Sequence, residues 1–347
     1  MKAIVGIRRE DKNRWERRTP LTPDGVARLV REEGLEFVVQ PSRLRIFPDQ
    51  LYRQAGARVD EDLSGCHLVM GVKEIPTKLL QKDQACLYFS NTIKAQPYNM
   101  AMLGRLMDLG CTLLDYEIVV DDEGRRTVFF GVHAGLAGMG ETLVALGRKL
   151  EARSMPNPFT DLLPPHELDG LAGLEAAVAR VGERIARDGL PSELVPLVFG
   201  FTGYGNVSRG AQDVLGQLPV IEIAPDELAG LSARADLSDR HVYKVVFREE
   251  HMVKPREGSF DLQEYYDHPE RYRSVFAGHA PHLDVLVNCI FWTERYPRLV
   301  TRQMARDPGR LKVVGDISCD IEGAIEFTTK ATMPDEPCFT FHPQTGE

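Results

Sequence analysis

The sequence lacks any close grouping of cysteines. Six are present, no CxxC pair occurs among them, and they are scattered along the chain. They are Cys66, Cys86, Cys111, Cys289, Cys319 and Cys338. Small secreted domains need a dense disulfide framework, and structural zinc sites need closely spaced ligands. The spacing argues against both, and it predicts a protein of a reducing compartment.

The sequence also has no excess of positive charge and no long hydrophobic run. Its net charge is -9 at pH 7 with both signs mixed, so no basic field could hold a nucleic-acid backbone or an anionic membrane. The opening residues, MKAIVGIRRE, contain too short an apolar run for a signal peptide, and no later stretch could span a bilayer. We therefore expect a soluble, cytoplasmic protein with no nucleic-acid or membrane partner.

Two familiar catalytic signatures are missing as well. The nine histidines form no HExxH motif or other close ligand spacing, so the sequence predicts no metal site. GxSxG is absent, which removes the main argument for an esterase-like hydrolase.

What the sequence does contain is an alternation of short apolar runs with longer amphipathic segments. AIVGI, EFVVQ, HLVMGVK and ACLYFS are apolar runs of this kind, whereas PDGVARLVREEG is amphipathic. The alternation is typical of a doubly wound sheet, and 347 residues exceed what one hydrophobic core usually serves. We predict an α/β protein with two Rossmann-like domains and a cleft between them. The expected division is a substrate domain at 1–135, a helical connector at 136–190 and a dinucleotide-binding domain at 191–320.

A glycine-containing turn follows the apolar run VPLVFGF. Its residues are Gly203, Tyr204, Gly205, Asn206, Val207, Ser208, Arg209 and Gly210. Glycines at a strand-to-helix turn let the backbone approach a pyrophosphate, and the helix N-terminus attracts its charge. Ser208 stands where the usual third glycine would be. The pattern predicts a dinucleotide site, and the alternative is a tight turn without a ligand.

The choice of nicotinamide cofactor should depend on the end of the following strand, PVIEIA. An acidic residue there would hold the ribose hydroxyls of NAD and repel the 2′-phosphate of NADP. That position is Ala224. Glu222, two residues earlier, could serve instead, or it could be a solvent-facing strand residue. We therefore favour NADP(H) over NAD(H), with Arg209 as a contact to the phosphate.

Cationic residues gather at the expected strand ends of the first half. They are Arg8, Arg9, Arg17, Arg18, Lys73 and Lys94. A substrate with several carboxylates needs fixed cations, although any single charge in RREDKNRWERR could simply lie in a solvated loop. Lys73 directly follows a buried strand, so we expect a lowered pKa suited to proton transfer. His133 precedes a helix of small residues, where it either lines a cleft or packs against backbone.

Several segments together resemble a known family. They are IRREDKNRWERRTPLTP, GVKEIP, YFSNTIKAQ, LLDYE, TGYGNVSRGAQ, DHPERY, LVNCIFW, PRLVTRQ and GDISCDIEGAIEF. In this order they resemble the lysine-ketoglutarate reductase domain of α-aminoadipic semialdehyde synthase and, more distantly, fungal saccharopine dehydrogenase and alanine dehydrogenase. The resemblance implies an alanine dehydrogenase-like fold. It also implies NADPH-dependent joining of L-lysine to 2-oxoglutarate to give saccharopine, a step of lysine degradation.

The resemblance further implies roles by position. Arg18 would hold a substrate carboxylate, Lys73 would be an acid/base, and Glu117 would contact substrate or tune Lys73. Asp316 would lie by the nicotinamide. The residues bordering the cofactor would be Asn288, Cys289 and Ile290.

Two features depart from the family pattern. Asn91 replaces the family's second acid/base histidine, and asparagine cannot accept and release a proton at neutral pH. We hypothesise that His133 or Lys94 supplies the missing function. The relatives continue past the segment that matches EPCFTFHPQTGE, so either the closure of the first domain is shortened or the chain is a fragment. Residues 321–347 are expected to return to the first domain.

Two other functions stay open. One is an opine- or alanine-type dehydrogenase that uses another amine and keto acid. The other is a non-catalytic NADP-binding sensor or regulatory subunit that lost turnover with Asn91. In the enzymatic cases the partners are small molecules, an amino acid and a 2-oxo acid, and the chain could form a homo-oligomer.

Overall fold

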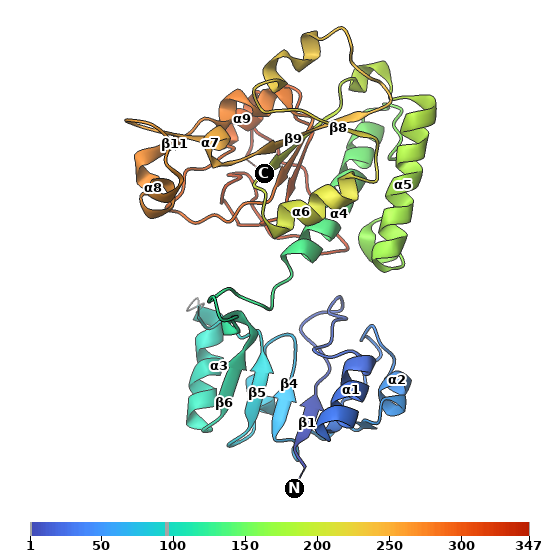
Figure 1. Cartoon of the computed structure of the whole chain (residues 1–347), viewed down its shortest axis with the longest axis vertical. Coiled ribbons are helices and arrows are strands. Elements are labelled where there is room, and N and C mark those ends of the chain that lie inside the picture. Colours follow the sequence, from blue (N-terminus) through green and yellow to red (C-terminus); the bar gives the residue numbers. More distant parts are fainter. Residues whose placement is uncertain (1, 94–96, 347) are drawn as a thin grey trace. The chain divides into compact units, whose positions relative to one another are not determined.

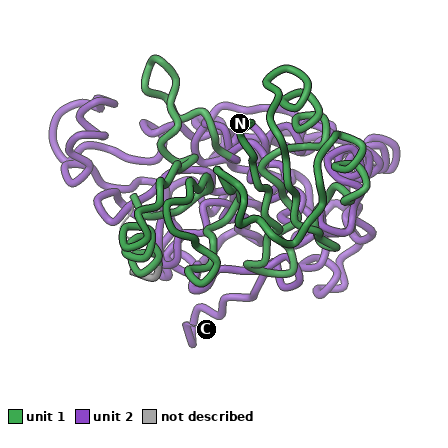
Figure 2. Tube along the Cα trace, turned by 90° about the horizontal axis from the view of Figure 1, so that it is seen from below, with its two compact units in different colours: residues 1–129 green, residues 130–347 purple. Residues whose placement is uncertain are grey.

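The computed structural model describes residues 2–93 and 97–346 (Figure 1). The chain divides into two compact units, Met1–Phe129 and Phe130–Glu347, which Figure 2 shows in different colours. Each unit has its own parallel sheet and its own hydrophobic clusters. The predicted α/β class is confirmed.

The first unit contains a six-stranded sheet in the order β3-β2-β1-β4-β5-β6, with every pairing parallel. Its strands are β1 (Ile4–Ile7), β2 (Glu36–Val39), β3 (Arg58–Val59), β4 (Leu68–Met70), β5 (Ala85–Tyr88) and β6 (Thr112–Asp115). The direction of winding reverses between the neighbours β1 and β4. Ligands of doubly wound sheets bind outside the carboxyl ends of the strands at such a reversal.

The helices of the first unit are α1 (Pro23–Glu33), α2 (Asp49–Gln54) and α3 (Pro97–Asp108). The start of α1 is fixed locally, because the Thr22 side chain accepts a hydrogen bond from the amide of Gly25 at 3.1 Å and Pro23 stands at the first helical position. Gly34, with φ of 65°, ends the helix. Its buried Val26 packs in one cluster with Ile7 of β1.

The second unit contains a five-stranded parallel sheet in the order β13-β12-β7-β9-β8. Its strands are β7 (Val198–Thr202), β8 (Val220–Glu222), β9 (Val242–Phe247), β12 (Val285–Asn288) and β13 (Val313–Asp316). A separate antiparallel pair joins β10 (Val253–Pro255) to β11 (Tyr272–Ser274). β8 follows β7 in the sequence, yet β9 lies between them. The strand after the glycine turn is therefore an edge strand.

The helices of the second unit include a long one that packs closely against the glycine-turn helix. They are α4 (Gly131–Glu151), α5 (Gly170–Asp188), α6 (Asn206–Leu215), α7 (Glu249–Met252), α8 (Leu262–Asp267) and α9 (Arg302–Arg306). A Cβ atom at Gly135 of α4 would lie 2.0 Å from the carbonyl oxygen of Val207. One at Gly210 of α6 would lie 2.1 Å from the carbonyl oxygen of Val132. Only glycine at both positions lets the two helix backbones approach this closely.

The compact units differ from the expected division in two places. α4 and α5 share a hydrophobic cluster with β7 and β12, so residues 136–190 are part of the second unit and not a separate connector. Residues 321–347 also belong to the second unit, where Ile325 forms a β-bridge with Val300. The expected return of this segment to the first domain is not observed. The assignment of one domain to substrate and the other to cofactor stays a prediction.

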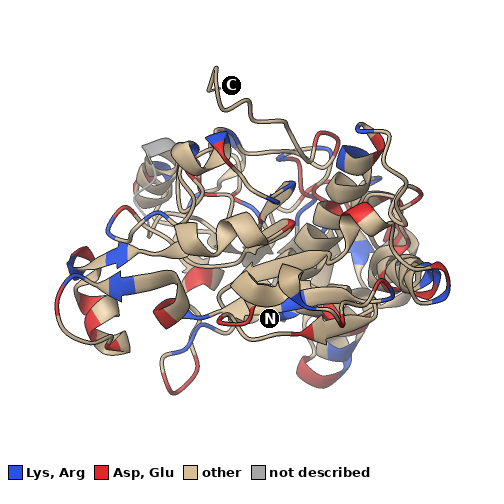
Figure 3. Cartoon of the chain, turned by 90° about the horizontal axis from the view of Figure 1, so that it is seen from above, with Lys and Arg blue, Asp and Glu red and all other residues tan. Residues whose placement is uncertain are grey.

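Acidic and basic residues are interspersed along both units (Figure 3). Within residues 2–93 and 97–346, no helix has the length and apolar character needed to cross a membrane. The same residues contain no group of three or more His, Cys, Asp or Glu side chains placed to hold a metal ion.

Candidate active site

Four predicted site residues of the first unit follow neighbouring strands. Arg18 lies in the loop after β1, Lys73 follows β4, Asn91 follows β5 and Glu117 follows β6. β1, β4, β5 and β6 are adjacent in the sheet and all parallel. Their carboxyl ends therefore meet at one edge of the sheet, which we call the charged edge. It includes the reversal between β1 and β4.

The turn that carries Lys73 is held by a buried carboxylate. Glu10 is 7% exposed, and its two oxygens accept hydrogen bonds from the backbone amides of Val72 at 2.7 Å and Lys73 at 3.0 Å. Burial raises the pKa of Glu10, although the Val72 amide, the Arg8 charge and the Lys73 amide act in the opposite direction. Glu10 was not predicted, because only the cations of this loop suggested a binding site.

Lys73 is half-buried beside a second ion pair. Burial, followed by the charge of Arg18, lowers its pKa, so the predicted direction is confirmed. Arg18 donates two hydrogen bonds to the carboxylate of Glu16, at 2.7 and 2.6 Å. Glu16 is 6% exposed, and the Arg18 pair lowers its pKa in spite of burial. Glu16 was also missed, and the only signal was an acid placed two residues before an arginine.

Several buried polar atoms at the charged edge have no hydrogen-bond partner among the described residues. They are Arg8 Nη1, Glu74 Oε2, Tyr116 hydroxyl and Glu117 Oε2. Burying such atoms without a partner costs roughly 1–3 kcal/mol each, so they normally face a ligand or a water molecule. They come from the segments after β1, β4 and β6, which predicts that this edge receives a polar ligand.

The loop after β5 carries the departure from the family. Asn91 is partly exposed and has φ of 55°, a left-handed conformation that asparagine tolerates better than most residues. Its neighbour Ser90 is buried, and both the amide and the hydroxyl of Ser90 bond to Asp115 at the end of β6. Lys94, the other residue predicted here, lies outside the described residues.

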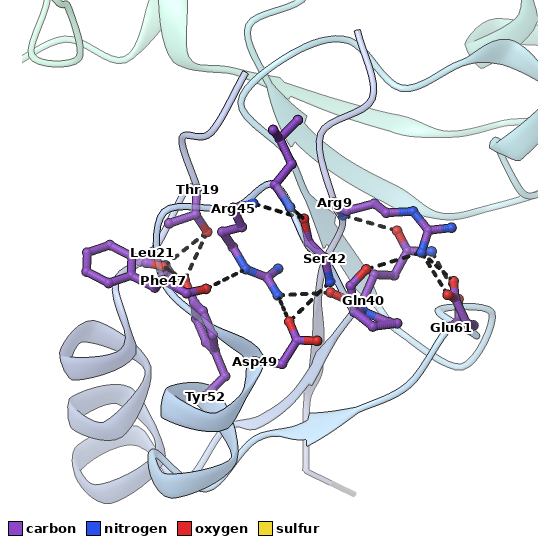
Figure 4. Close-up of polar contacts among 12 residues, drawn as sticks. Arg9, Thr19, Leu21, Gln40, Ser42, Arg45, Phe47, Asp49, Tyr52 and Glu61 are labelled. Atoms are coloured by element: carbon purple, nitrogen blue, oxygen red, sulfur yellow. Dashed lines mark hydrogen bonds and ion pairs between the residues drawn. The ribbon is translucent and has the colours of Figure 1, made fainter. Parts of the chain in front are cut away.

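Two further arginines of the first unit, Arg9 after β1 and Arg45 after β2, have different partners (Figure 4). Arg9 donates to both carboxylate oxygens of Glu61 at 2.8 Å. Arg45, a residue that we did not predict, is 7% exposed and donates to Asp49 at 2.5 Å while its guanidinium lies over the Tyr52 ring. Arg9 thus forms a surface ion pair, which agrees with the alternative of a solvated loop. The cations whose charges lower the pKa of Lys73 are Arg18 and Lys12.

In the second unit the glycine turn has the geometry of a phosphate cradle. Gly203 has φ of 82°, and its amide donates to the carbonyl of Phe247 at 2.9 Å. Gly205 is the N-cap of α6, and no side chain caps the helix. A Cβ atom at Gly205 would have no atom within 4 Å. The space beside the Gly205 N-cap is therefore open, and the turn with its uncapped helix start fits a dinucleotide pyrophosphate.

Ser208, which stands at the usual third glycine position, points into the protein. It is 0% exposed, and its hydroxyl accepts a hydrogen bond from Gln212 at 2.9 Å. The close approach of helices that the third glycine usually permits occurs instead at Gly210, two residues later.

A hydrogen-bonded chain crosses the strand ends of the second unit. The Thr202 hydroxyl donates to the side-chain oxygen of Asn288 at 2.7 Å, and the side-chain amide of Asn288 donates to Asp316 at 2.8 Å. The other oxygen of Asp316 accepts from Thr328 at 2.5 Å. Burial raises the pKa of Asp316 although these donors oppose the change. We call this row the polar edge.

Cys289 and Ile290 continue from the polar edge toward the glycine turn. Cys289 is buried, which raises the pKa of its thiol to about 12 and makes it a poor nucleophile. A Cβ atom at Gly203 would lie 3.1 Å from Ile290. The predicted cofactor residues of the turn and of the segment after β12 are therefore neighbours.

Glu222 does not lie beside the glycine turn. It is at the end of β8, with β9 between that strand and β7, and its carboxylate pairs with Lys244 of β9 at 2.7 Å. The strand after the glycine turn, β8, is therefore not a neighbour of β7. Arg209 is exposed in the first turn of α6, where it donates to the Asn206 side chain at 2.5 Å.

His133 lies in the first turn of α4 and is exposed. The alternative of a packed histidine is therefore wrong. Its proposed role in place of the family histidine stays a prediction, because His133 belongs to the second unit and Asn91 to the first.

Known proteins with a matching domain or a similar fold indicate the class of protein. Residues 6–137 match the family model "Alanine dehydrogenase/PNT, N-terminal domain". The fold is similar to that of an L-alanine dehydrogenase, with a TM-score of 0.57 and 18% identity over 97% of this chain and 80% of that one. It is also similar to a transhydrogenase from Sinorhizobium meliloti, with a TM-score of 0.52 and 16% identity over 93% and 80%. The chain therefore shares the fold of these two proteins.

Sequence relatives then narrow the class. The chain is 40% identical to α-aminoadipic semialdehyde synthase of Arabidopsis thaliana, over 99% of this chain and 34% of that protein. It is 38% identical to the mitochondrial α-aminoadipic semialdehyde synthase of Rattus norvegicus, over 97% and 38%. It is 28% identical to the NAD(+), L-lysine-forming saccharopine dehydrogenase of Neurospora crassa, over 96% and 79%. The chain is similar to these enzymes over nearly its whole length, and it spans little more than a third of the length of the two synthases.

Proposed function

We propose that the chain is a saccharopine-forming oxidoreductase, which joins L-lysine to 2-oxoglutarate and reduces the resulting imine with NADPH. The observation that carries the proposal is the charged edge. There a half-buried lysine of lowered pKa stands beside Arg18, among buried polar atoms that have no hydrogen-bond partner within the described residues. Homology to enzymes named for this chemistry supports it.

Lys73 is the proton-transfer residue of the proposed reaction. A lowered pKa leaves more of its amine neutral near pH 7, so it can accept the proton that the substrate ε-ammonium must lose before attack on the keto carbon. The protonated Lys73 can then return a proton to the hydroxyl that leaves as water when the imine forms. Glu10 accepts a hydrogen bond from the backbone amide of Lys73 and so holds the Lys73 backbone in place, which makes Glu10 a positioning residue.

Carboxylate recognition falls to Arg18. Its guanidinium is bound to Glu16, which orients the donor group while 43% of the Arg18 side chain stays exposed for a further partner. A guanidinium can bind a carboxylate through two parallel hydrogen bonds. Glu117, whose Oε2 is buried without a partner among the described residues, is suited to accept a hydrogen bond from the substrate amine. We propose Lys94 as a further substrate contact.

The dinucleotide would be held by residues 203–209, with Asn288, Cys289 and Ile290 bordering it. When bound, the reduced nicotinamide supplies the hydride for the imine carbon. Asp316, whose pKa is raised by burial, is held by Asn288 and Thr328, so it presents a fixed polar group beside the proposed nicotinamide position.

Asn91 favours a second candidate, a relative that binds NADP without turnover. We propose instead that His133 or Lys94 replaces the missing histidine. Asn91→His should then raise kcat only slightly, and His133→Ala or Lys94→Met should lower it by about 10- to 100-fold. If Asn91→His restores a large rate while neither of the other variants has any effect, the replacement does not occur.

Oxidation of NADPH in the presence of L-lysine and 2-oxoglutarate tests the function. We expect turnover that requires both substrates, with saccharopine identified by mass spectrometry. Ornithine with 2-oxoglutarate and L-lysine with pyruvate are the matched controls, and a faster rate with either pair would favour the opine- or alanine-type alternative. Tight NADPH binding without oxidation by any pair would favour the non-catalytic relative. Cytoplasmic location and homo-oligomer formation also stay proposals, and the rat relative is named mitochondrial.

A further inference from the structure

We propose that Arg248 selects NADP(H) by binding the 2′-phosphate of the cofactor, with Tyr204 holding its guanidinium in place. This inference rests on the proposed function, because it assumes that the glycine turn binds a nicotinamide dinucleotide. It replaces both Glu222 and Arg209 as the residue that decides the cofactor.

The position of Arg248 follows from the strand order of the second sheet. β9 pairs with β7 on the side away from β12, with Phe247 in register with Thr202. The amide of Gly203 donates to the carbonyl of Phe247 at 2.9 Å, which ties the end of β9 to the start of the turn. In dinucleotide-binding sheets, the residue that contacts the adenosine ribose stands at the end of the strand beside the glycine-turn strand. Here that strand is β9, and the next residue is Arg248.

The side chain of Arg248 has the chemistry of a phosphate contact. Its guanidinium lies over the ring of Tyr204, 5.0 Å from the ring centroid, and Tyr204 is the middle residue of the Gly203 to Gly205 turn. Stacking uses the flat face of the guanidinium and leaves its N–H edge available for hydrogen bonds. Arg248 is exposed, and it forms no ion pair with a carboxylate anywhere in the described part of the chain. A ribose phosphate would provide the missing anion.

The two residues predicted from the sequence are less suitable. Glu222 forms an ion pair with Lys244, and its strand β8 is separated from β7 by β9. Lys244 also donates to Gln212 of α6 at 3.0 Å, so this pair is fixed by its own contacts. Arg209 is bound to Asn206 within the same helical turn. An NAD-specific site would require a carboxylate where Arg248 stands.

The role of Arg248 can be tested by binding measurements, which do not require turnover. Dissociation constants are measured by calorimetry for NADPH, NADH, adenosine 2′,5′-bisphosphate and 5′-AMP, with the full chain and with Arg248→Gln. We expect Arg248→Gln to weaken NADPH and the bisphosphate by about 10- to 100-fold, the range of a lost charge-assisted contact. NADH and 5′-AMP should change by less than about threefold, because they lack the 2′-phosphate. Arg248→Lys, which keeps the charge but not the fork, should lose less.

Two further arginine variants complete the design. Arg256→Gln removes the same charge from another exposed arginine of the second unit and should leave all four constants unchanged. Arg209→Gln tests the rival. If Arg209→Gln and not Arg248→Gln removes the preference for the 2′-phosphate, or if Arg248→Gln weakens all four ligands equally, our assignment is wrong. Unchanged binding of 5′-AMP shows that the variant is folded.

The wild-type protein separates this inference from the proposed function. If it binds NADPH no better than NADH, the NADP preference and the role of Arg248 both fail, whereas lysine-dependent oxidation of NADH could still demonstrate saccharopine formation. If it prefers NADPH and Arg248→Gln keeps that preference, only the role of Arg248 fails.

Discussion

The charged edge of the first unit and the polar edge of the second differ in what supplies the polarity. At the charged edge the polar groups are ionisable side chains, such as Glu16, Arg18 and Lys73, and several buried atoms have no partner within the described residues. At the polar edge Thr202, Asn288 and Asp316 bond to one another. In the second unit the groups suited to a ligand are instead backbone groups of the glycine turn, where no side chain caps α6.

The two regions should therefore tolerate different amino-acid substitutions. Function at the charged edge depends on side-chain charge and pKa, so isosteric neutral substitutions should be the damaging ones. Function at the glycine turn depends on backbone access, so the addition of a single methyl group should be damaging there.

Lys73→Met should lower kcat for lysine-dependent NADPH oxidation by about 10²- to 10⁴-fold, because it removes the proton-transfer group. Binding of NADPH, followed by fluorescence, should not change. Lys78→Met is the matched control, since Lys78 is an exposed lysine five positions farther along. Equal losses in the two variants would mean that Lys73 has no special role.

Gly135→Ala should destabilise the second unit by about 2–3 kcal/mol or more. The new methyl group would meet the carbonyl oxygen of Val207 at 2.0 Å, so α4 and α6 must separate. Urea denaturation measures the change. Gly104→Ala, in α3 with nothing within 4 Å of a new Cβ atom, should be neutral or stabilising by up to about 1 kcal/mol. A stable Gly135→Ala variant would contradict the close helix packing.

Gly205→Ala should raise the dissociation constant for NADPH by about tenfold while leaving the unfolding midpoint nearly unchanged. A Cβ atom at this position touches no protein atom within 4 Å, but it would occupy the space through which a pyrophosphate approaches. Gly230→Ala, equally open, is the control. If calorimetry shows the same affinity for both variants, the turn does not seat the dinucleotide.

Arg18→Gln should move the limb of the kcat/KM profile that reports Lys73 to higher pH. The Arg18 charge is the second cause that lowers the Lys73 pKa, and its removal also releases Glu16, whose negative charge raises that pKa. Both effects have the same sign. Arg17→Gln should leave the limb in place, because Arg17 is not among the causes of the shift. A move to lower pH would contradict the charge arrangement.

Much of the fold could be predicted from local patterns. Short apolar runs at β1, β2, β4, β5 and β7 predicted the strands, because a strand buried on both faces of a parallel sheet must be apolar throughout. The glycine turn was equally local, since φ of 82° at Gly203 and an open N-terminus are properties of a few consecutive residues. For the same reason, Lys73 could be predicted as partly desolvated from its place after β4.

The acidic partners of the site were not predicted. Glu10 and Glu16 lie in a segment whose charges look like a solvated loop. Glu10 is buried because the turn after β4 packs beside that loop, where the amides of Val72 and Lys73 donate to the Glu10 carboxylate. Such a contact joins residues more than 60 positions apart, so no window along the sequence contains it.

The strands, the glycine turn and the places of the cations follow from the order of the amino acids, because each depends on neighbours within a few residues. The position of β9 between β7 and β8 is a property of the folded sheet, and it separates Glu222 from the glycine turn and brings Arg248 to it. The tertiary structure also places residues 321–347 with the second unit. Strand order and segment docking depend on hydrogen bonds and packing between distant parts of the chain, and a single sequence does not record which of the alternative pairings has the lowest free energy.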